Sequence, residues 1–198
     1  MRLGRRWGGP IRRALFGPPP AGGVWGAGRP WQMLQQANAL MAGGQPRQAA
    51  ALYDELAQMA AARAMPRRAA LLHIQAARAW LAAGDGQAAV DRARRGFGAF
   101  IALGQGARVA RLLPEVTARL RQRGYAQAAD TLERDLQAQL ARAGIDAAAL
   151  TSMGAAAQRG TLPASCPHCG APLRSDEVEW VDAASAECPY CGMIVKAE

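Results

Sequence analysis

Between residues 31 and 160, small and apolar side chains recur with the period of an α-helix. Leu72, Ala76, Ala79 and Ala83 follow one another at intervals of three or four residues, which places them on one face of a helix. The region is also rich in Ala, Leu, Gln and Arg and poor in β-branched residues, a composition that favours helices. The pattern therefore predicts a mainly α fold for most of the chain.

Glycine divides this helical pattern into pairs. Gly44, Gly84 and Gly124 lie forty residues apart, and each is followed five residues later by an alanine. We expect the glycine to end one helix and the alanine to let the next helix pack closely. Pro114 should either kink the fifth helix or restart it after a turn. The predicted helices cover residues 31–42, 46–62, 66–83, 87–103, 107–122 and 126–143, and a short helix over 146–153 caps the array.

The repeating segments resemble tetratricopeptide repeats. The resemblance rests on Gly44 with Ala49 and Tyr53, and on Ala82-Ala-Gly-Asp85 followed by Ala89. It implies stacked antiparallel helix pairs that bind a protein or peptide. The forty-residue period is longer than that of the family. The tyrosine that usually follows the glycine by two residues is replaced here by Pro46, Gly86 and Ala126.

The chain has four cysteines, and all of them lie within the last 33 residues. They form two C-x2-C pairs separated by eighteen residues, the spacing expected of a structural zinc site. We predict that one Zn(II) per chain is bound by Cys166, Cys169, Cys188 and Cys191, a ligand set that also suits iron. His168 should be an exposed turn residue, since four thiolates complete a tetrahedron. Disulfides and redox thiols are the alternatives, and the matched pairs favour the metal.

Each cysteine pair carries Pro after the first Cys and Gly after the second, as in Cys166-Pro-His-Cys-Gly170 and Cys188-Pro-Tyr-Cys-Gly192. These segments resemble the knuckles of zinc ribbons and rubredoxin-like modules. The resemblance covers residues 164–198 and implies a metal and a small β fold, without implying an activity. The sequence predicts strands near residues 178–182, 186–188 and 193–196.

Charge is distributed unevenly along the chain, whose formal net charge is +9. Residues 1–30 carry six arginines and no acid among Gly and Pro, so we interpret them as a disordered basic arm. The helical repeat domain then covers residues 31–154, a linker 155–163 and the zinc ribbon 164–198. Residues 166–198 hold six acids against Arg174 and Lys196, a net charge of −4.

The arginines are the most prominent surface feature that the pattern predicts. Residues Arg108, Arg111, Arg119 and Arg123 fall on one face of the fifth predicted helix. That face is either a phosphate-binding stripe or a solvated surface, and the nearby Glu115 and Pro114 favour the second interpretation. Asp54, Glu55 and Asp91 are likewise interpreted as solvated charges.

Catalytic motifs are missing from the sequence. His73 is the only histidine outside the cysteine segment, and no serine precedes Ser152. Tyr53 and Trp80 are interpreted as packing residues, with a groove-lining role as the alternative. We expect a non-enzymatic adaptor that binds a protein or peptide. The alternative is an RNA- or DNA-binding accessory protein that uses the basic arm and the array, and a metal-sensing or redox protein is a third, weaker hypothesis.

Location follows from the cysteines and from hydropathy. Cysteines confined to metal knuckles are typical of a reducing compartment, so the cytoplasm is expected. The sequence has no run of eighteen consecutive apolar residues, so we do not expect a transmembrane helix. Residues 1–30 carry tryptophan among arginines and are a candidate for peripheral contact with a membrane surface.

Overall fold

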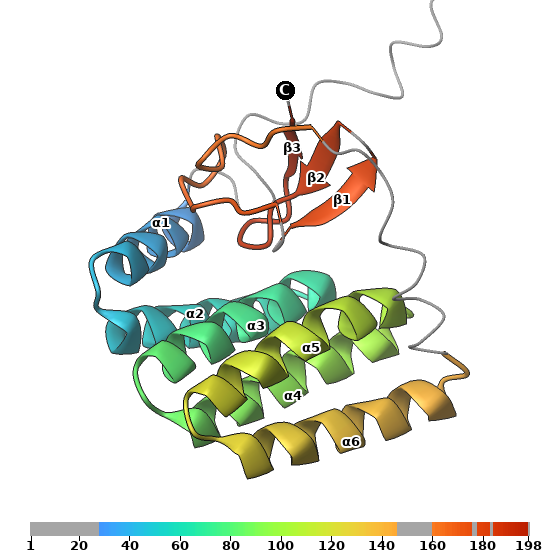
Figure 1. The fold of residues 1–198 in the computed structure, drawn as a ribbon. Coiled ribbons are helices and arrows are strands. Elements are labelled where there is room, and N and C mark those ends of the chain that lie inside the picture. Colours follow the sequence, from blue (N-terminus) through green and yellow to red (C-terminus); the bar gives the residue numbers. More distant parts are fainter. Residues whose placement is uncertain (1–27, 146–159, 176–177, 183, 198) are drawn as a thin grey trace, which may run out of the picture.

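The computed structural model describes residues 28–145, 160–175, 178–182 and 184–197. Figure 1 shows an array of helices followed by a small sheet, which confirms the predicted fold class. The predicted basic arm, apart from residues 28–30, and the predicted capping helix over 146–153 lie outside the described residues. The elements are α1 (Arg29–Ala42), α2 (Pro46–Ala62), α3 (Pro66–Ala82), α4 (Gly86–Ala102), α5 (Gly106–Gln122), α6 (Ala126–Arg142), β1 (Glu179–Asp182), β2 (Ser185–Glu187) and β3 (Ile194–Lys196).

The helices are joined by tight turns of one kind, repeated every twenty residues. In each turn the residue that enters the next helix donates its backbone N–H to a carbonyl five residues earlier, as Asp85 does to Trp80 over 3.0 Å. This bond is typical of a helix that ends at a left-handed residue. Gly84 supplies that residue with φ +83°, and Gly44, Gly104, Gly124 and Gly144 do the same elsewhere. The prediction that glycine ends a helix is confirmed at Gly44, Gly84 and Gly124, and Gly104 and Gly144 have the same role.

One turn lacks its glycine. Ala64 occupies the left-handed position between α2 and α3 with φ +53°. A Cβ atom makes this conformation unfavourable, so the turn is held by the helices on either side. With Ala64, Gly104 and Gly144 included, the turn recurs every twenty residues, so the forty-residue period of the sequence covers one pair of helices.

Pro114 lies within a continuous helix, so the predicted restart of α5 after a turn is wrong. Proline has no N–H and cannot donate to the carbonyl of Ala110, but it does not end the helix here. Val116, Leu120 and Val109 of α5 are buried in the array. This packing compensates for the lost hydrogen bond.

Helix α3 is the centre of the array and separates two apolar clusters. One face contributes Leu72 and Ala76 to a cluster with α1, α2 and the C-terminal residues. The other contributes Ile74 and Leu81 to a cluster with α4, α5 and α6. Both clusters therefore depend on a helix in which eleven residues are buried.

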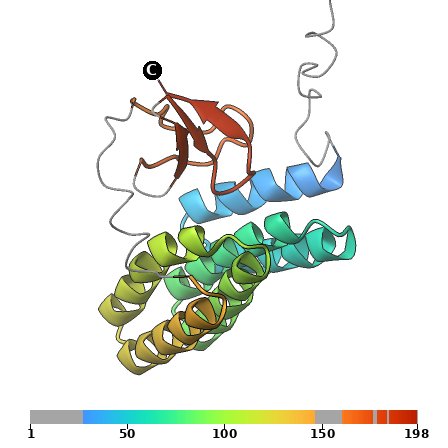
Figure 2. The ribbon, with the colours of Figure 1, turned by 90° about the vertical axis from the view of Figure 1, so that its right-hand side faces the viewer.

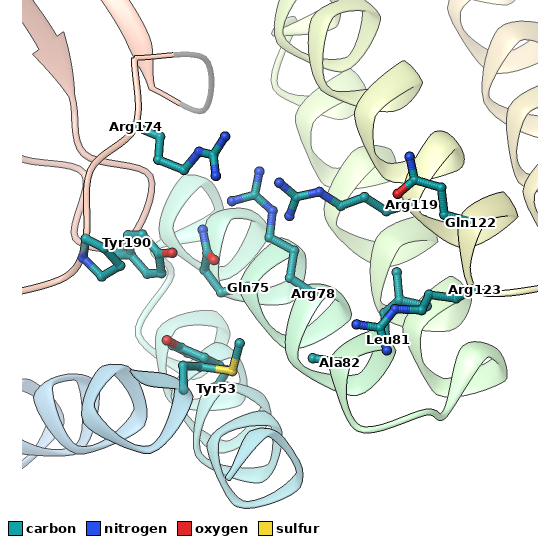
Figure 3. Close-up of a pocket in the computed structure, with 12 residues that line it drawn as sticks. Tyr53, Gln75, Arg78, Leu81, Ala82, Arg119, Gln122, Arg123, Arg174 and Tyr190 are labelled. Atoms are coloured by element: carbon teal, nitrogen blue, oxygen red, sulfur yellow. The ribbon is translucent and has the colours of Figure 1, made fainter. Parts of the chain in front are cut away.

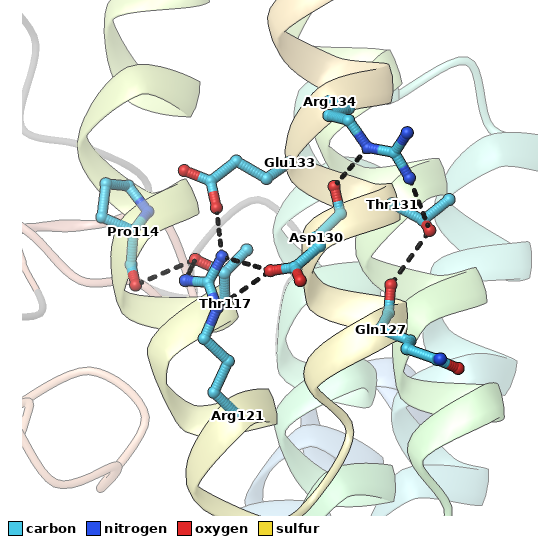
Figure 4. A network of polar contacts seen from close by, with 8 residues as sticks. All are labelled: Pro114, Thr117, Arg121, Gln127, Asp130, Thr131, Glu133 and Arg134. Carbon is cyan, nitrogen blue, oxygen red and sulfur yellow. Dashed lines mark hydrogen bonds and ion pairs between the residues drawn. The ribbon is translucent and has the colours of Figure 1, made fainter.

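A polar network joins α5 to α6 on the outside of the second cluster (Figure 4). The Arg121 guanidinium contacts Asp130 Oδ1 at 2.8 Å and Glu133 Oε2 at 2.6 Å. Thr117 donates to the carbonyl of Pro114 over 3.2 Å. The Arg121 contacts are exposed to solvent, so burial of Leu132, Leu136 and Leu140 accounts for most of the stability of α6.

The C-terminal residues form a compact unit, here called the cysteine module (residues 164–197). Its strands pair antiparallel in the order β1-β2-β3, close to the three predicted segments. Figures 1 and 2 place the module against one side of the array, above α1, α3 and α5. The four cysteines, Val178 and Val195 share one apolar cluster with α1 and α2. The two parts predicted as separate domains thus have a common core.

Candidate metal centre

The four predicted ligands converge at one point. Cys166 Sγ lies 3.8 Å from Cys191 Sγ, and the sulfur atoms of the other pair, Cys169 and Cys188, are also 3.8 Å apart. All four sulfur atoms lie within 4.8 Å of one another, and all four side chains are buried. A tetrahedral zinc ion with bonds of about 2.3 Å requires sulfur–sulfur distances of about 3.8 Å. The cysteines are therefore positioned to hold one metal ion.

Matching backbone turns position the two cysteine pairs. Gly170 N–H donates to the carbonyl of Cys166 over 2.8 Å, and Gly192 N–H donates to that of Cys188 over 2.9 Å. Gly170 has φ +69° and Gly192 φ +71°, the left-handed conformation for which glycine is suited. The same local geometry at two places explains why the Cys-Pro-x-Cys-Gly pattern occurs twice.

The repulsion among four closely spaced sulfur atoms in their thiolate form favours a cation at their centre. Hydrogen bonding to Cys166 raises the pKa of Cys169 and of Cys191, whereas hydrogen bonding to Cys169 lowers the pKa of Cys166. The thiols alone would thus share protons, because four buried thiolates repel one another. A divalent cation removes that repulsion and displaces the remaining protons.

Side chains of the array hold the backbone around the cysteines. Asn38 Nδ2 of α1 donates to the carbonyl of Cys169 over 3.3 Å. Arg68 of α3 donates to the carbonyl of Cys191 over 2.7 Å, and Gln75 Nε2 donates to the adjoining Pro189 carbonyl over 3.0 Å. Burial lowers the pKa of Arg68 to about 10. These polar residues of the array therefore form the outer shell of the cysteine cluster, a role that no sequence motif indicated.

Acidic residues of the module meet arginines of the array. The Glu187 side chain contacts Arg67 and also lies 3.0 Å from the guanidinium of Arg108. Arg108 and Arg111 both contact Glu179. Only 4% of the Arg108 side chain is exposed, and burial lowers its pKa. The negative charge of the module is thereby paired with α3 and α5.

The prediction of a solvated arginine face on α5 must therefore be corrected at Arg108, which is buried and pairs with the module. Arg111 is exposed, as predicted for a solvated face, and it also lies 3.6 Å from Glu179. Arg119 instead contacts Glu115 at 2.9 Å, and Arg123 is exposed at the end of α5. Ion pairs between residues about 70 positions apart leave no periodic signal in one sequence.

Other predicted residues have clear positions. Tyr53 is 1% exposed and donates to Asn38 Oδ1 over 2.7 Å, so it packs the core and supports a contact to the module. Asp54, interpreted as a solvated charge, instead accepts from Trp80 Nε1 and from Arg92, both at 2.9 Å. That interpretation was wrong for Asp54.

The histidines do not join the cysteine cluster. His168 is exposed, as predicted. His73 is partly buried on α3, and burial lowers its pKa, which favours the neutral form. Among the described residues, the four cysteines are the only group of side chains positioned to hold a metal ion.

A cavity of about 450 Å³ opens where α3 and α5 meet the module (Figure 3). We call it the junction cavity. Tyr53 and Gln75 form part of its wall beside Tyr190 of the module. The complete lining comprises Met41, Tyr53, Gln75, Arg78, Leu81, Ala82, Arg119, Gln122, Arg123, Pro172, Arg174 and Tyr190.

Comparison with protein-family models, curated proteins and solved structures finds no significant match to this chain. Among the described helices, none is both long enough and apolar enough to cross a membrane.

Proposed function

We propose that this protein is a non-enzymatic adaptor in which a tetratricopeptide-like array and a zinc ribbon jointly dock a protein or peptide partner. The observation that carries the proposal is the junction cavity, which both parts line. Stacked helix pairs provide extended surfaces for partners. In this protein the module covers part of such a surface, and the cavity is the opening beside it.

The metal has a structural role in this proposal. The four cysteines supply a complete tetrahedral shell, so no coordination position is left for a substrate or an activated water. Zn(II) suits this ligand set, and iron is the substitute that the same four thiolates accept. The metal holds the two knuckles, and the knuckles carry Tyr190 to the cavity wall.

Nucleic-acid binding is the second candidate, and the ion pairs weaken it. Arg108 and Arg111, which would have belonged to a phosphate-binding stripe, contact Glu179 of the module. The module itself is acidic, which disfavours contact with phosphates. The array therefore offers fewer arginines to a nucleic acid than its sequence suggested.

Site-specific photo-crosslinking tests the adaptor hypothesis. A photoreactive residue would replace Gln122, which is exposed and lines the cavity, or Gln48, which is exposed on α2 and does not line it. We expect a discrete protein adduct in cells from position 122 only, and its loss in a Cys188→Ser background. Equal labelling from both positions, or adducts with nucleic acid alone, would rule out the adaptor hypothesis.

Metal analysis tests the structural half. Protein purified from zinc-containing medium should hold about one zinc per chain, and the Cys188→Ser variant should hold far less. Binding should weaken as the pH falls, because the thiols whose pKa is raised, Cys169 and Cys191, must lose their protons first.

A further inference from the structure

The junction cavity gathers positive charge from three parts of the fold. Arg78 comes from α3, Arg119 and Arg123 from α5, and Arg174 from the module. Figure 3 shows the guanidinium groups of Arg78, Arg119 and Arg174 pointing toward one another. No Asp or Glu among the described residues lines the cavity. Its lining thus carries four formal positive charges.

One nearby acid offsets part of this charge. Glu115 Oε1 lies 3.1 Å from Arg78 and 2.9 Å from Arg119. Glu115 is not part of the cavity lining, so the guanidinium groups that line the cavity can still donate to an anion inside it. Such contacts are charge-assisted hydrogen bonds, which are stronger than bonds between neutral groups.

Helix α5 alone does not explain the arrangement. Arg119 lies in the last turn of α5, and a cation there interacts favourably with the helix dipole. Arg78 lies inside α3, however, and Arg174 belongs to the module, so the dipole of α5 explains neither. The convergence arises because the module docks on the array.

The remaining walls fit a peptide better than a bare ion. Tyr190, Pro172 and Leu81 supply apolar surface, and the amides of Gln75 and Gln122 supply hydrogen-bonding groups. A volume of about 450 Å³ is within the range of sites that hold small ligands or a few residues. Planar guanidinium groups bind carboxylates in a bidentate manner.

We propose that the junction cavity binds an acidic segment of a partner protein, with Asp or Glu carboxylates on its arginines and an apolar side chain against Tyr190. The inference rests on the proposed adaptor function and specifies the chemistry of the partner. It also assigns a purpose to the module: Arg174 joins the cluster only when the module is folded on the array.

Fluorescence anisotropy on the zinc-loaded full chain tests this inference. The probe is a fluorescein-labelled peptide of about eight residues that repeats Asp, Glu and Leu, and the control probe has Asn and Gln in place of the acids. We expect the acidic peptide to bind and the amide peptide not to bind. The double variant Arg123→Gln/Arg174→Gln should weaken binding about tenfold or more, because two charge-assisted contacts are lost.

Matched variants separate a site from general attraction to a basic protein. Arg47→Gln and Arg142→Gln each remove an exposed arginine that does not line the cavity. They should bind the acidic peptide as the wild type does. Equal weakening by these controls, or unchanged binding in the double variant, would overturn the inference. Arg123 and Arg174 are both exposed, so the double variant should keep its fold. Measurements of zinc content and circular dichroism would verify this.

Two further probes decide the class of ligand. A phosphoserine peptide and a short single-stranded RNA, tested under the same conditions, should bind more weakly than the acidic peptide. Tighter cavity-dependent binding of either would overturn the choice of an acidic segment. A cellular adduct at position 122 that persists in the double variant would refute this inference while supporting the adaptor function. Cavity-dependent peptide binding without any cellular partner would do the reverse.

Discussion

The two ends of the helical array are completed in different ways. At α4, α5 and α6 the core is made of leucine, valine, phenylalanine and alanine side chains from neighbouring helices. At α1 and α2 it includes the cysteine cluster, where Asn38 bonds to Cys169 across 131 residues of sequence. Of the six buried polar side chains among the described residues, only Thr117 does not join the array to the module.

This difference separates generic from specific packing. Apolar contacts at α4–α6 tolerate exchange among residues of similar volume. At the module, Arg68 and Arg108 are buried with particular partners, and each would incur a desolvation cost without them. We therefore expect one end of the array to be stable by itself and the other to depend on the module.

Metal removal should produce the largest effect. Structural zinc supplies on the order of 10 kcal/mol to a module of this size, so a strong chelator or Cys188→Ser should unfold residues 164–197. Because α1 and α2 share their core with the cysteines, we expect amide-exchange protection to fall in α1 and persist in α4–α6. Unchanged protection in α1 would mean that the array is independent of the module.

Removal of a buried acid should come next. Glu187→Ala takes a carboxylate from Arg67 and Arg108 and should lower the free energy of unfolding by about 3 kcal/mol, because Arg108 stays buried. Asp130→Ala is the control in the other half, where the partner Arg121 is exposed. Urea titrations should give a lower midpoint for the first variant only; equal midpoints would contradict the contrast.

A matched pair of leucines tests the two cores directly. Leu34 of α1 and Leu136 of α6 are both fully buried. Each change to alanine should cost about 2–5 kcal/mol, since each leaves a cavity. Only Leu34→Ala should accelerate zinc transfer to a chromophoric chelator, because Leu34 belongs to the cluster that contains the cysteines. Similar release rates for both variants would indicate one undivided core.

The turns should give the smallest effects. Ala64→Gly removes a Cβ from a left-handed residue and should stabilise the protein by up to about 1 kcal/mol. Gly104→Ala introduces one at φ +70° in the other half and should cost about 1 kcal/mol. Thermal unfolding would show opposite shifts in midpoint. A loss of stability in Ala64→Gly would indicate that the contacts of the alanine methyl group stabilise the protein by more than the left-handed conformation costs.

Local features of this protein were predictable because they have local causes. Helix ends are set by glycine and proline, and the predicted bounds agree with those of α2 to α6 within one residue. The candidate metal-binding cluster followed from the spacing of Cys166, Cys169, Cys188 and Cys191. Of the two outcomes predicted at Pro114, the restart of α5 after a turn was wrong, because tertiary packing outweighs a local preference.

The contacts that the sequence did not reveal join residues far apart in the chain, which meet only when the helices and the module pack together. Arg108 meets Glu187 across 79 positions, and Asp54 meets Arg92 across 38. Charge totals gave a hint, since the module is acidic and the array basic. A single sequence, however, does not identify which of sixteen arginines between residues 31 and 165 meets which acid.

The long separation between Asn38 and Cys169 has a consequence for the order of folding. Turns that repeat every twenty residues can form while the chain is being synthesised, whereas a contact across 131 residues must wait for the module. Until then, Asn38, Arg68 and Gln75 remain hydrated on the growing array. We therefore expect a metal that binds the four cysteines to act late in folding, because a chain without a folded module leaves α1 uncovered and open to chaperones and proteases.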